Sequence, residues 1–332
     1  MTPGPFFAFA EPHFDFQGSG RLRYVLNVMD RRLKKIVLAL HYGFCMGVKR
    51  AIKIAEETGR TEPGPVSVIH EIVHNEAVVR KLAEEGVGCV SAVSKAPDGT
   101  IIVSAHGAPP ALFEEAKRRG LKIVDATCPL VIRIHRIIHK LIDSGYHIIH
   151  FGDIQHDETI GVVGQAPPGR VHVVQDIEAL GRLERSGRKY ALTAQTTAGV
   201  AEFERVSRAA KEIFPGIEIF NTICNATSQR QAAVSNIAPE VELILVVGSA
   251  SSANSNRLRI ISEAMCGRAY LIDRADDLDD SWLDGVETVG VTAGASTPDF
   301  LVEEVIERLV RFSGGTAAVV RSHAEQENDL FV

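Results

Sequence analysis

DATCPLVIRIHR, residues 125–136, places a cysteine between a strand-like run and a helical pattern. Residues 122–124 form a short apolar run that ends at Asp125, and Pro129 opens a stretch with helical spacing of apolar residues. Proline is tolerated at the first helical position, because the N–H that it lacks has no partner within the helix there. Cys128 is therefore expected at a helix N-terminus, where the helix dipole favours the thiolate.

The same arrangement occurs twice more along the chain. GFCMGVKRAI places Cys45 after an apolar run and before a helical pattern, and NTICNATSQRQAAV does the same for Cys224. The gaps between the three cysteines are 83 and 96 residues. This regular spacing predicts three related α/β units, each of which presents one thiolate to a shared centre.

Chain length, net charge, apolar run length and cysteine count limit the class of protein. A chain of 332 residues fits two or three domains of about 150 residues each. A net charge of −6 argues against general binding to nucleic acid or to an anionic membrane surface. No apolar run reaches the ~18 residues that span a bilayer, so we expect no membrane segment. Five cysteines, an odd number, favour a reducing cytoplasm over a disulfide framework.

From Lys34 onward, short apolar runs alternate with helical patterns. Continuous Val, Ile and Leu runs in such an alternation predict parallel sheets covered by helices on both faces. Ligands of such sheets bind outside the carboxyl ends of the strands. The predicted strands are 35–40, 66–70, 100–105, 122–124, 146–152, 170–174, 189–194, 218–221, 243–248, 269–273 and 288–293.

The fold predicted is α/β, with three similar domains in a pseudo-threefold arrangement around one centre. The domains are predicted at residues 34–126, 127–222 and 223–313. Residues 1–33 lack the features of a signal peptide and are predicted to be a disordered extension, with Met29 as a more natural start. Residues 314–332 lose periodicity and are predicted to be a loose end or a flap.

Polar residues in strand-to-helix turns repeat with the cysteines. His74, His156 and Asn254 follow the three cysteines by 29, 28 and 30 residues. A later turn in each unit offers a second polar group, and these are His106, Thr196 and Ser296. Together with Ser252, these donors at helix starts are suited to binding phosphate. Walker and Rossmann glycine motifs are absent from the sequence, which argues against ordinary nucleotide binding. Taken alone, each donor is also explained as a helix cap, and for Ser252 and Ser296 a cap is the more common role.

Glu158 follows His156 by two residues, so it is expected near the same centre. A carboxyl group in a desolvated pocket has a raised pKa and can serve as a general acid. The alternative is a first-turn residue that interacts with the helix dipole. The sequence leaves these two interpretations open, and Asp157 is expected to be solvated or to cap the helix.

Three thiolates that converge from separate units could hold zinc or an iron–sulfur cluster. Structural zinc usually takes four ligands in closely spaced pairs, and the sequence has no C-x-x-C pair. Three widely spaced ligands instead suit a cubane cluster in which one iron lacks a protein ligand and acts as a Lewis acid. The alternative for any single cysteine is inert packing, which is what we expect of Cys89 and Cys266.

Nine motifs in this order closely resemble the 4-hydroxy-3-methylbut-2-enyl diphosphate reductase (IspH/LytB) family, over about residues 34–312. They are GFCMGVKRAI, HEIVHNEAVV, SAHGAPPALFEEAK, DATCPLV, HDE, AQTT, ICNATSQRQ, GSASSANSNRL and VTAGASTPD. The resemblance implies three α/β domains around a central [4Fe-4S] cluster bound by Cys45, Cys128 and Cys224. It also implies the last step of the methylerythritol phosphate route to isoprenoids, in which two electrons and two protons remove a hydroxyl as water. The products are isopentenyl and dimethylallyl diphosphate.

Site roles follow from the resemblance residue by residue. The substrate alcohol is expected to meet the iron that lacks a protein ligand, with Glu158 as proton donor and Thr196 hydrogen-bonded to the hydroxyl. The residues matched to diphosphate binding are His74, His106, His156, Ser252, Asn254 and Ser296. The expected electron donor is ferredoxin or flavodoxin, and nucleic-acid and membrane partners are not expected.

The chain departs from the family pattern at three places. Ala253 stands where the family commonly has a second serine, HYGFC replaces the frequent Pro-Arg-Gly-Phe-Cys, and Asp157 replaces the usual proline after the histidine. Two other functions are alternatives to the reductase: a redox-neutral hydratase that uses the open iron only as a Lewis acid, and an iron or oxygen sensor. The sensor is disfavoured because the sequence shows no nucleic-acid-binding motif or basic stripe.

Overall fold

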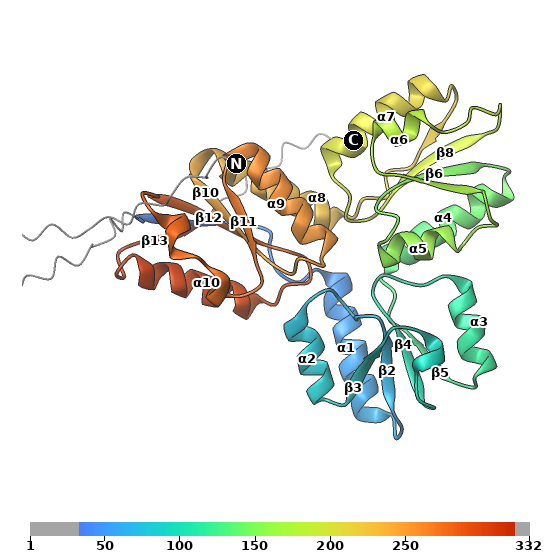
Figure 1. The fold of residues 1–332 in the computed structure, drawn as a ribbon, viewed down its shortest axis with the longest axis horizontal. Coiled ribbons are helices and arrows are strands. Elements are labelled where there is room, and N and C mark those ends of the chain that lie inside the picture. The colour runs from blue at the N-terminus through green and yellow to red at the C-terminus, as the bar shows by residue number, and fades with distance from the viewer. Residues whose placement is uncertain (1–32, 323–332) are drawn as a thin grey trace, which may run out of the picture.

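Three parallel sheets, each with helices on both faces, make up the computed structural model, which describes residues 33–322 (Figure 1). The first sheet has the order β3 (Val87–Val90), β2 (Val66–Ile69), β4 (Thr100–Val103) and β5 (Lys122–Asp125). The second has the order β7 (Val171–Val174), β6 (His147–Phe151), β8 (Tyr190–Ala194) and β9 (Glu218–Ile219). The third has the order β11 (Ala269–Ile272), β10 (Leu243–Val247), β12 (Thr288–Ala293), β1 (Lys35–Leu38) and β13 (Ala318–Arg321). The predicted α/β class with parallel sheets is confirmed.

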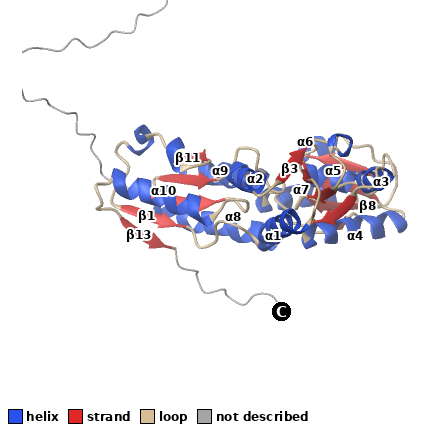
Figure 2. Cartoon of the chain, turned by 90° about the horizontal axis from the view of Figure 1, so that it is seen from below, coloured by secondary structure: helices blue, strands red, loops and turns tan. Residues whose placement is uncertain are grey.

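Ten α-helices connect the strands of the described chain. They are α1 (Met46–Thr61), α2 (Glu76–Glu84), α3 (Pro110–Arg118), α4 (Pro129–Asp143), α5 (Asp157–Val163), α6 (Ile177–Gly181), α7 (Val200–Ile213), α8 (Asn225–Ile237), α9 (Ala253–Cys266) and α10 (Asp299–Phe312). Amphipathic spacing explains their placement: in α4, Val131, Ile134, Ile138 and Leu141 are buried on one face. Seen edge-on, α1, α4 and α8, the helices that follow the three cysteines, lie along one face of the flat molecule (Figure 2).

The first strand corrects the predicted domain boundaries. β1 was assigned with residues 34–126 to the first unit, but it pairs in parallel with β12 and β13 in the third sheet, with Ile36 opposite Val289. Strands that are neighbours in sequence usually pair, but β1 finds its apolar surroundings in the third unit, where Val37 and Ala39 pack near α8. The described part of the chain therefore starts in the third sheet, forms the first two units and returns to the third sheet.

The two strands that the sequence did not predict lie at sheet edges. β13 contradicts the expected loose end over part of residues 314–332, and all four of its residues are exposed. β3 has only Val87 fully buried, and Cys89 is exposed on it, so the predicted core packing of Cys89 is wrong. Neither strand has a continuous buried run of apolar residues: β3 has the sequence VGCV, and β13 is exposed along its whole length. Cys266 is half-buried against a hydrophobic cluster, as expected.

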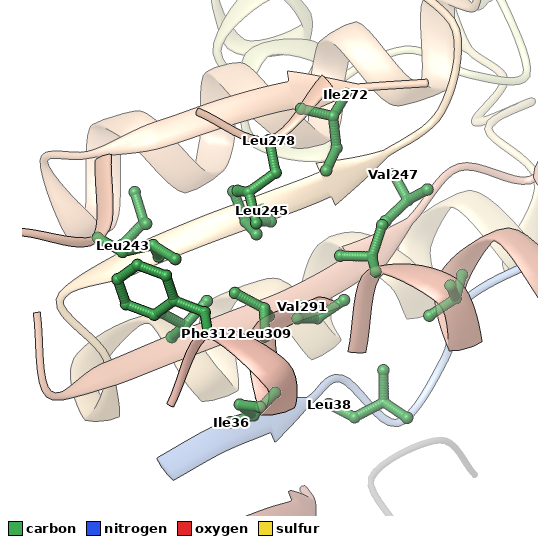
Figure 3. Packing of buried hydrophobic residues seen from close by; sticks show 14 of the residues in the cluster. Ile36, Leu38, Leu243, Leu245, Val247, Ile272, Leu278, Val291, Leu309 and Phe312 are labelled. Carbon is green, nitrogen blue, oxygen red and sulfur yellow. The ribbon is translucent and has the colours of Figure 1, made fainter. Parts of the chain in front are cut away.

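The third sheet has the largest apolar core among the described residues. Figure 3 shows Leu309 and Phe312 of α10 packed against Leu243 and Leu245 of β10, with Ile36 of β1 nearby. Burial of such side chains contributes about 1.5–3 kcal/mol each. Within residues 33–322, no helix has both the length and the apolar character needed to cross a bilayer. The predictions for residues 1–32, including the start at Met29, lie outside the described chain.

Candidate active site where the three sheets meet

A cavity of about 330 Å³ lies where the strand-end loops of the three units meet. Every residue that the sequence predicted for the site lines it. These are Cys45, Cys128, Cys224, His74, His106, His156, Glu158, Thr196, Ser252, Asn254 and Ser296. The structure thus brings together in space side chains that the sequence spreads over more than 250 positions.

The three cysteines are the N-cap residues of α1, α4 and α8. Cys45 Sγ accepts a hydrogen bond from Val48 N at 3.5 Å, and Cys224 Sγ accepts one from Thr227 N at 3.3 Å. Such N–H groups favour a thiolate, whereas burial raises the pKa of Cys128 and Cys224. Burial is the larger effect, so these two sulfurs are thiols until a positive charge, such as a metal, lowers their pKa.

Gly47 shows how closely the sulfurs approach each other. A Cβ atom at this position would lie 2.6 Å from Cys128 Sγ and 3.9 Å from Cys45 Sγ. The two sulfurs are therefore no farther apart than these distances combined. Only glycine leaves this space free beside both sulfurs.

Replacement of Gly47 by alanine is expected to displace the Cys128 sulfur, at a cost of about 1–3 kcal/mol for overpacking. We expect most of the iron to be lost when the variant is reconstituted without oxygen and its iron and sulfide are measured. The matched control is Gly181→Ala, a helical glycine whose added Cβ would meet no atom within 4 Å. Wild-type iron content in Gly47→Ala would contradict the sequence-based prediction that these sulfurs bind one metal centre.

Three histidines that line the cavity lie against one another. The rings of His74 and His106 stack with centroids 4.5 Å apart, and His156 meets their edges at 5.6 and 5.3 Å. One ring nitrogen from each lies within 4.8 Å of the others. Burial lowers the pKa of His156 to about 4 and that of His106 well below its usual value, and neighbouring histidines add to both effects. These two rings are therefore neutral at pH 7, and an anion placed among them would favour their protonation.

Hydroxyl and amide groups border the histidines. Asn254 Nδ2 and Oδ1 are buried and have no hydrogen-bond partner among the described residues, and the same holds for His106 Nε2. Ser252 Oγ caps α9 by accepting from Ser255 N at 3.3 Å, and Ser296 Oγ donates to the His74 carbonyl at 3.1 Å. Buried polar groups are almost always hydrogen-bonded, so the unpaired atoms of Asn254 and His106 point to a ligand.

Glu158 is buried, with 2% of its surface exposed. Its carboxylate accepts hydrogen bonds from Thr196 N at 2.6 Å and from Thr196 Oγ1 at 2.5 Å. Burial raises the pKa of Glu158 to about 7, and the two bonds from Thr196 oppose that rise. This carboxyl group is suited to give or take a proton near neutral pH.

Comparison with known proteins identifies the family of this chain. A family model described as LytB protein matches residues 36–310. The chain belongs to the LytB family. It is an oxidoreductase, as the sequence predicted.

The relatives of this LytB-family chain cover most of its length. A 4-hydroxy-3-methylbut-2-enyl diphosphate reductase from a Polaromonas species is 42% identical over 288 residues, which are 86% of each chain. One from Psychrobacter arcticus is 43% identical over 84% of this chain and 90% of its own. The solved structure of the E-1-hydroxy-2-methyl-but-2-enyl-4-diphosphate reductase from Plasmodium falciparum has a TM-score of 0.84 and 33% identity, and covers 90% of this chain and 96% of its own.

One charged residue near the cysteines of this LytB-family chain, Arg230, was not predicted from the sequence, and it does not line the cavity itself. Arg230 of α8 is buried and donates to the carbonyls of Ala226 and Gly43. Its charge acts on the Cys45 and Cys224 sulfurs, while burial lowers the pKa of Arg230. The only signal in the sequence was an arginine six residues after Cys224, within the predicted helix that follows this cysteine, and it was too weak to assign a role.

Proposed function

We propose that this chain catalyses the reductive dehydroxylation of 4-hydroxy-3-methylbut-2-enyl diphosphate to isopentenyl diphosphate and dimethylallyl diphosphate. This is the last step of the methylerythritol phosphate route to isoprenoids. The observation that carries the proposal is the single cavity in which three cysteines, three histidines and a buried glutamate meet. The names of the relatives reported above give this diphosphate as their substrate.

The three cysteines fit a [4Fe-4S] cluster, one per chain. Each comes from the start of a different helix, the space beside Gly47 is free, and no fourth cysteine lines the cavity within the described residues. Cys45, Cys128 and Cys224 would hold three irons, and the fourth would lack a protein ligand. When bound, such a cluster supplies electrons and Lewis acidity.

The histidine side of the cavity would bind the diphosphate. His74, His106 and His156 would supply ring N–H donors, and Asn254 Nδ2 is buried without a partner among the described residues. Ser252 and Ser296 lie beside them and add hydroxyls. Three histidines alone also suit a metal ion, but the surrounding hydroxyl and amide groups favour a phosphate with many oxygens. Binding the diphosphate would orient the reacting end of the substrate.

Glu158 would supply the proton that lets hydroxide leave as water. Thr196 holds both carboxylate oxygens, so the group is fixed in one orientation, and Thr196 Oγ1 is placed to exchange hydrogen bonds with the substrate hydroxyl. A pKa of about 7 leaves a large share of Glu158 protonated at neutral pH.

We further propose ferredoxin or flavodoxin as electron donor and the cytoplasm as location.

Turnover with and without reductant tests this function. Protein reconstituted with iron and sulfide under anaerobic conditions should convert the alcohol diphosphate to the two isoprenoid diphosphates only when a reductant such as dithionite is added. A hydratase would need no electrons. Conversion without reductant, or no conversion by iron-loaded protein, would contradict the proposal.

A further inference from the structure

A close contact joins the first and second units just outside the cavity. His70 Nδ1 lies 2.7 Å from Asp157 Oδ1. His70 follows β2 of the first sheet, and Asp157 is the first residue of α5, which belongs to the second unit. Neither residue lines the cavity.

The backbone of His70 is held in an unfavourable conformation. Its φ is +56°, and no other residue apart from glycine has a positive φ in the chain between Leu33 and Ser322. Its N–H donates to the Val90 carbonyl at 2.8 Å, which fixes the peptide to the neighbouring strand. Side chains other than glycine are disfavoured in the left-handed region, and such residues persist where their surroundings hold them and cluster at functional sites.

Both ends of this contact are next to residues of the cavity. The loop that begins at His70 also carries His74, whose carbonyl accepts from Ser296 Oγ. Asp157 lies between His156 and Glu158, and His156 Nδ1 accepts from Glu158 N at 3.2 Å. A shift between the two units would therefore change the 5.6 Å spacing of the His74 and His156 rings and the aim of Glu158 together.

We propose that His70 and Asp157 form a positioning pair that fixes the histidine cluster of the first unit against the start of α5 in the second. The pair would set how tightly the cavity grips a diphosphate and how Glu158 faces the bound substrate. This proposal rests on the proposed function for its substrate, although the geometry that it explains does not depend on that substrate.

Asp157 has a second possible role, since an acidic residue in the first turn stabilises a helix through its dipole. The two roles predict different effects on the other unit. Loss of a dipole interaction would loosen α5 alone. Loss of a positioning pair would also loosen residues 71–75, the loop between β2 and α2 in the first unit.

The experiment compares His70→Asn, Asp157→Ala and the double variant with wild type. Asparagine tolerates the left-handed backbone, so the first change removes the ring without adding strain. We expect each single variant to raise KM for the alcohol diphosphate about tenfold and to lower kcat less. The KM of the double variant should be no higher than that of the more strongly affected single variant, because the two residues act as one unit. The control is Glu178→Ala, a first-turn acid of α6 whose ion-pair partner, Arg182, is on the same helix.

Hydrogen–deuterium exchange of the substrate-free proteins gives a readout that needs no activity. In both single variants, amides of residues 71–75 and of α5 should exchange faster than in wild type, and the control should leave both unchanged. Additive effects of the two changes on KM, or unchanged exchange of residues 71–75 in Asp157→Ala, would contradict the proposal that His70 and Asp157 form a positioning pair. Failure of the proposed function would instead appear as a wild type without reductive turnover, and the exchange data would still decide the role of the pair.

Discussion

Glu158→Gln is expected to lower kcat by about 10²–10⁴-fold, the range lost when a positioned general acid is removed. Glutamine keeps the size of the side chain and can still bond to Thr196, but it has no proton to give at neutral pH. The iron content should be unchanged, because Glu158 is not proposed as a ligand. Steady-state kinetics of iron-loaded protein with dithionite measures the loss.

The pKa of Glu158 also gives this prediction a pH signature. The folded pKa is about 7 against an ordinary value of 4.5, so the native state holds the proton more tightly than the unfolded chain does. The stabilisation from this group is fully present below pH 4.5 and is lost as pH rises through 7. As pH rises over that window, the unfolding free energy of wild type should fall by about 3 kcal/mol relative to that of Glu158→Gln.

A matched control for Glu158 is Glu202→Gln. Glu202 is half-buried and paired with Arg257 at 2.9 Å, but it does not line the cavity. Its replacement should leave kcat within about threefold of wild type, since distant sites act independently. Near-normal turnover of Glu158→Gln would remove this residue from the acid role.

Cys128→Ser is expected to abolish stable cluster binding. Serine is well tolerated at the N-cap position of α4, but it replaces the soft thiolate that iron–sulfur clusters prefer. The reconstituted variant should lose the broad absorption near ~400 nm that thiolate-ligated clusters give, together with all reductive turnover. Iron and sulfide analysis beside the absorption spectrum measures both.

Cys266→Ser provides the control for the cysteine chemistry. Cys266 Sγ donates to the Val241 carbonyl, and the residue lies outside the cavity. Serine can make the same bond, so iron content and turnover should match wild type. If Cys128→Ser held a wild-type complement of iron, the assignment of the metal ligands would be wrong.

The site could be predicted from sequence because it is built from helix starts and strand ends. Cys128 precedes a proline at the first helical position, and the same local signal recurs at Cys45 and Cys224. Parallel sheets bring their strand ends to one edge, so residues placed in such turns could be expected to converge. The family, the parallel α/β fold and the oxidoreductase class are confirmed, whereas the role of each residue stays a prediction.

Other features depended on contacts that local patterns do not encode. From the sequence, Glu158 could be either a general acid or a residue that interacts with the helix dipole. Its environment depends on Thr196, which is 38 residues away in the sequence and contacts the carboxylate only in the folded chain. β1 joined the third sheet because its apolar partners come from the far end of the chain. Edge strands such as β13 are exposed and carry no buried pattern to read.

Electron paramagnetic resonance of reduced, iron-loaded protein, recorded before and after addition of the alcohol diphosphate, tests the central claim most directly. If three cysteines hold a cluster whose fourth iron faces the diphosphate site, the reduced protein will give an iron–sulfur signal that changes when the substrate is added and is lost in Cys128→Ser. A signal that the substrate leaves unchanged, or protein that binds no iron and sulfide after reconstitution, would contradict the account.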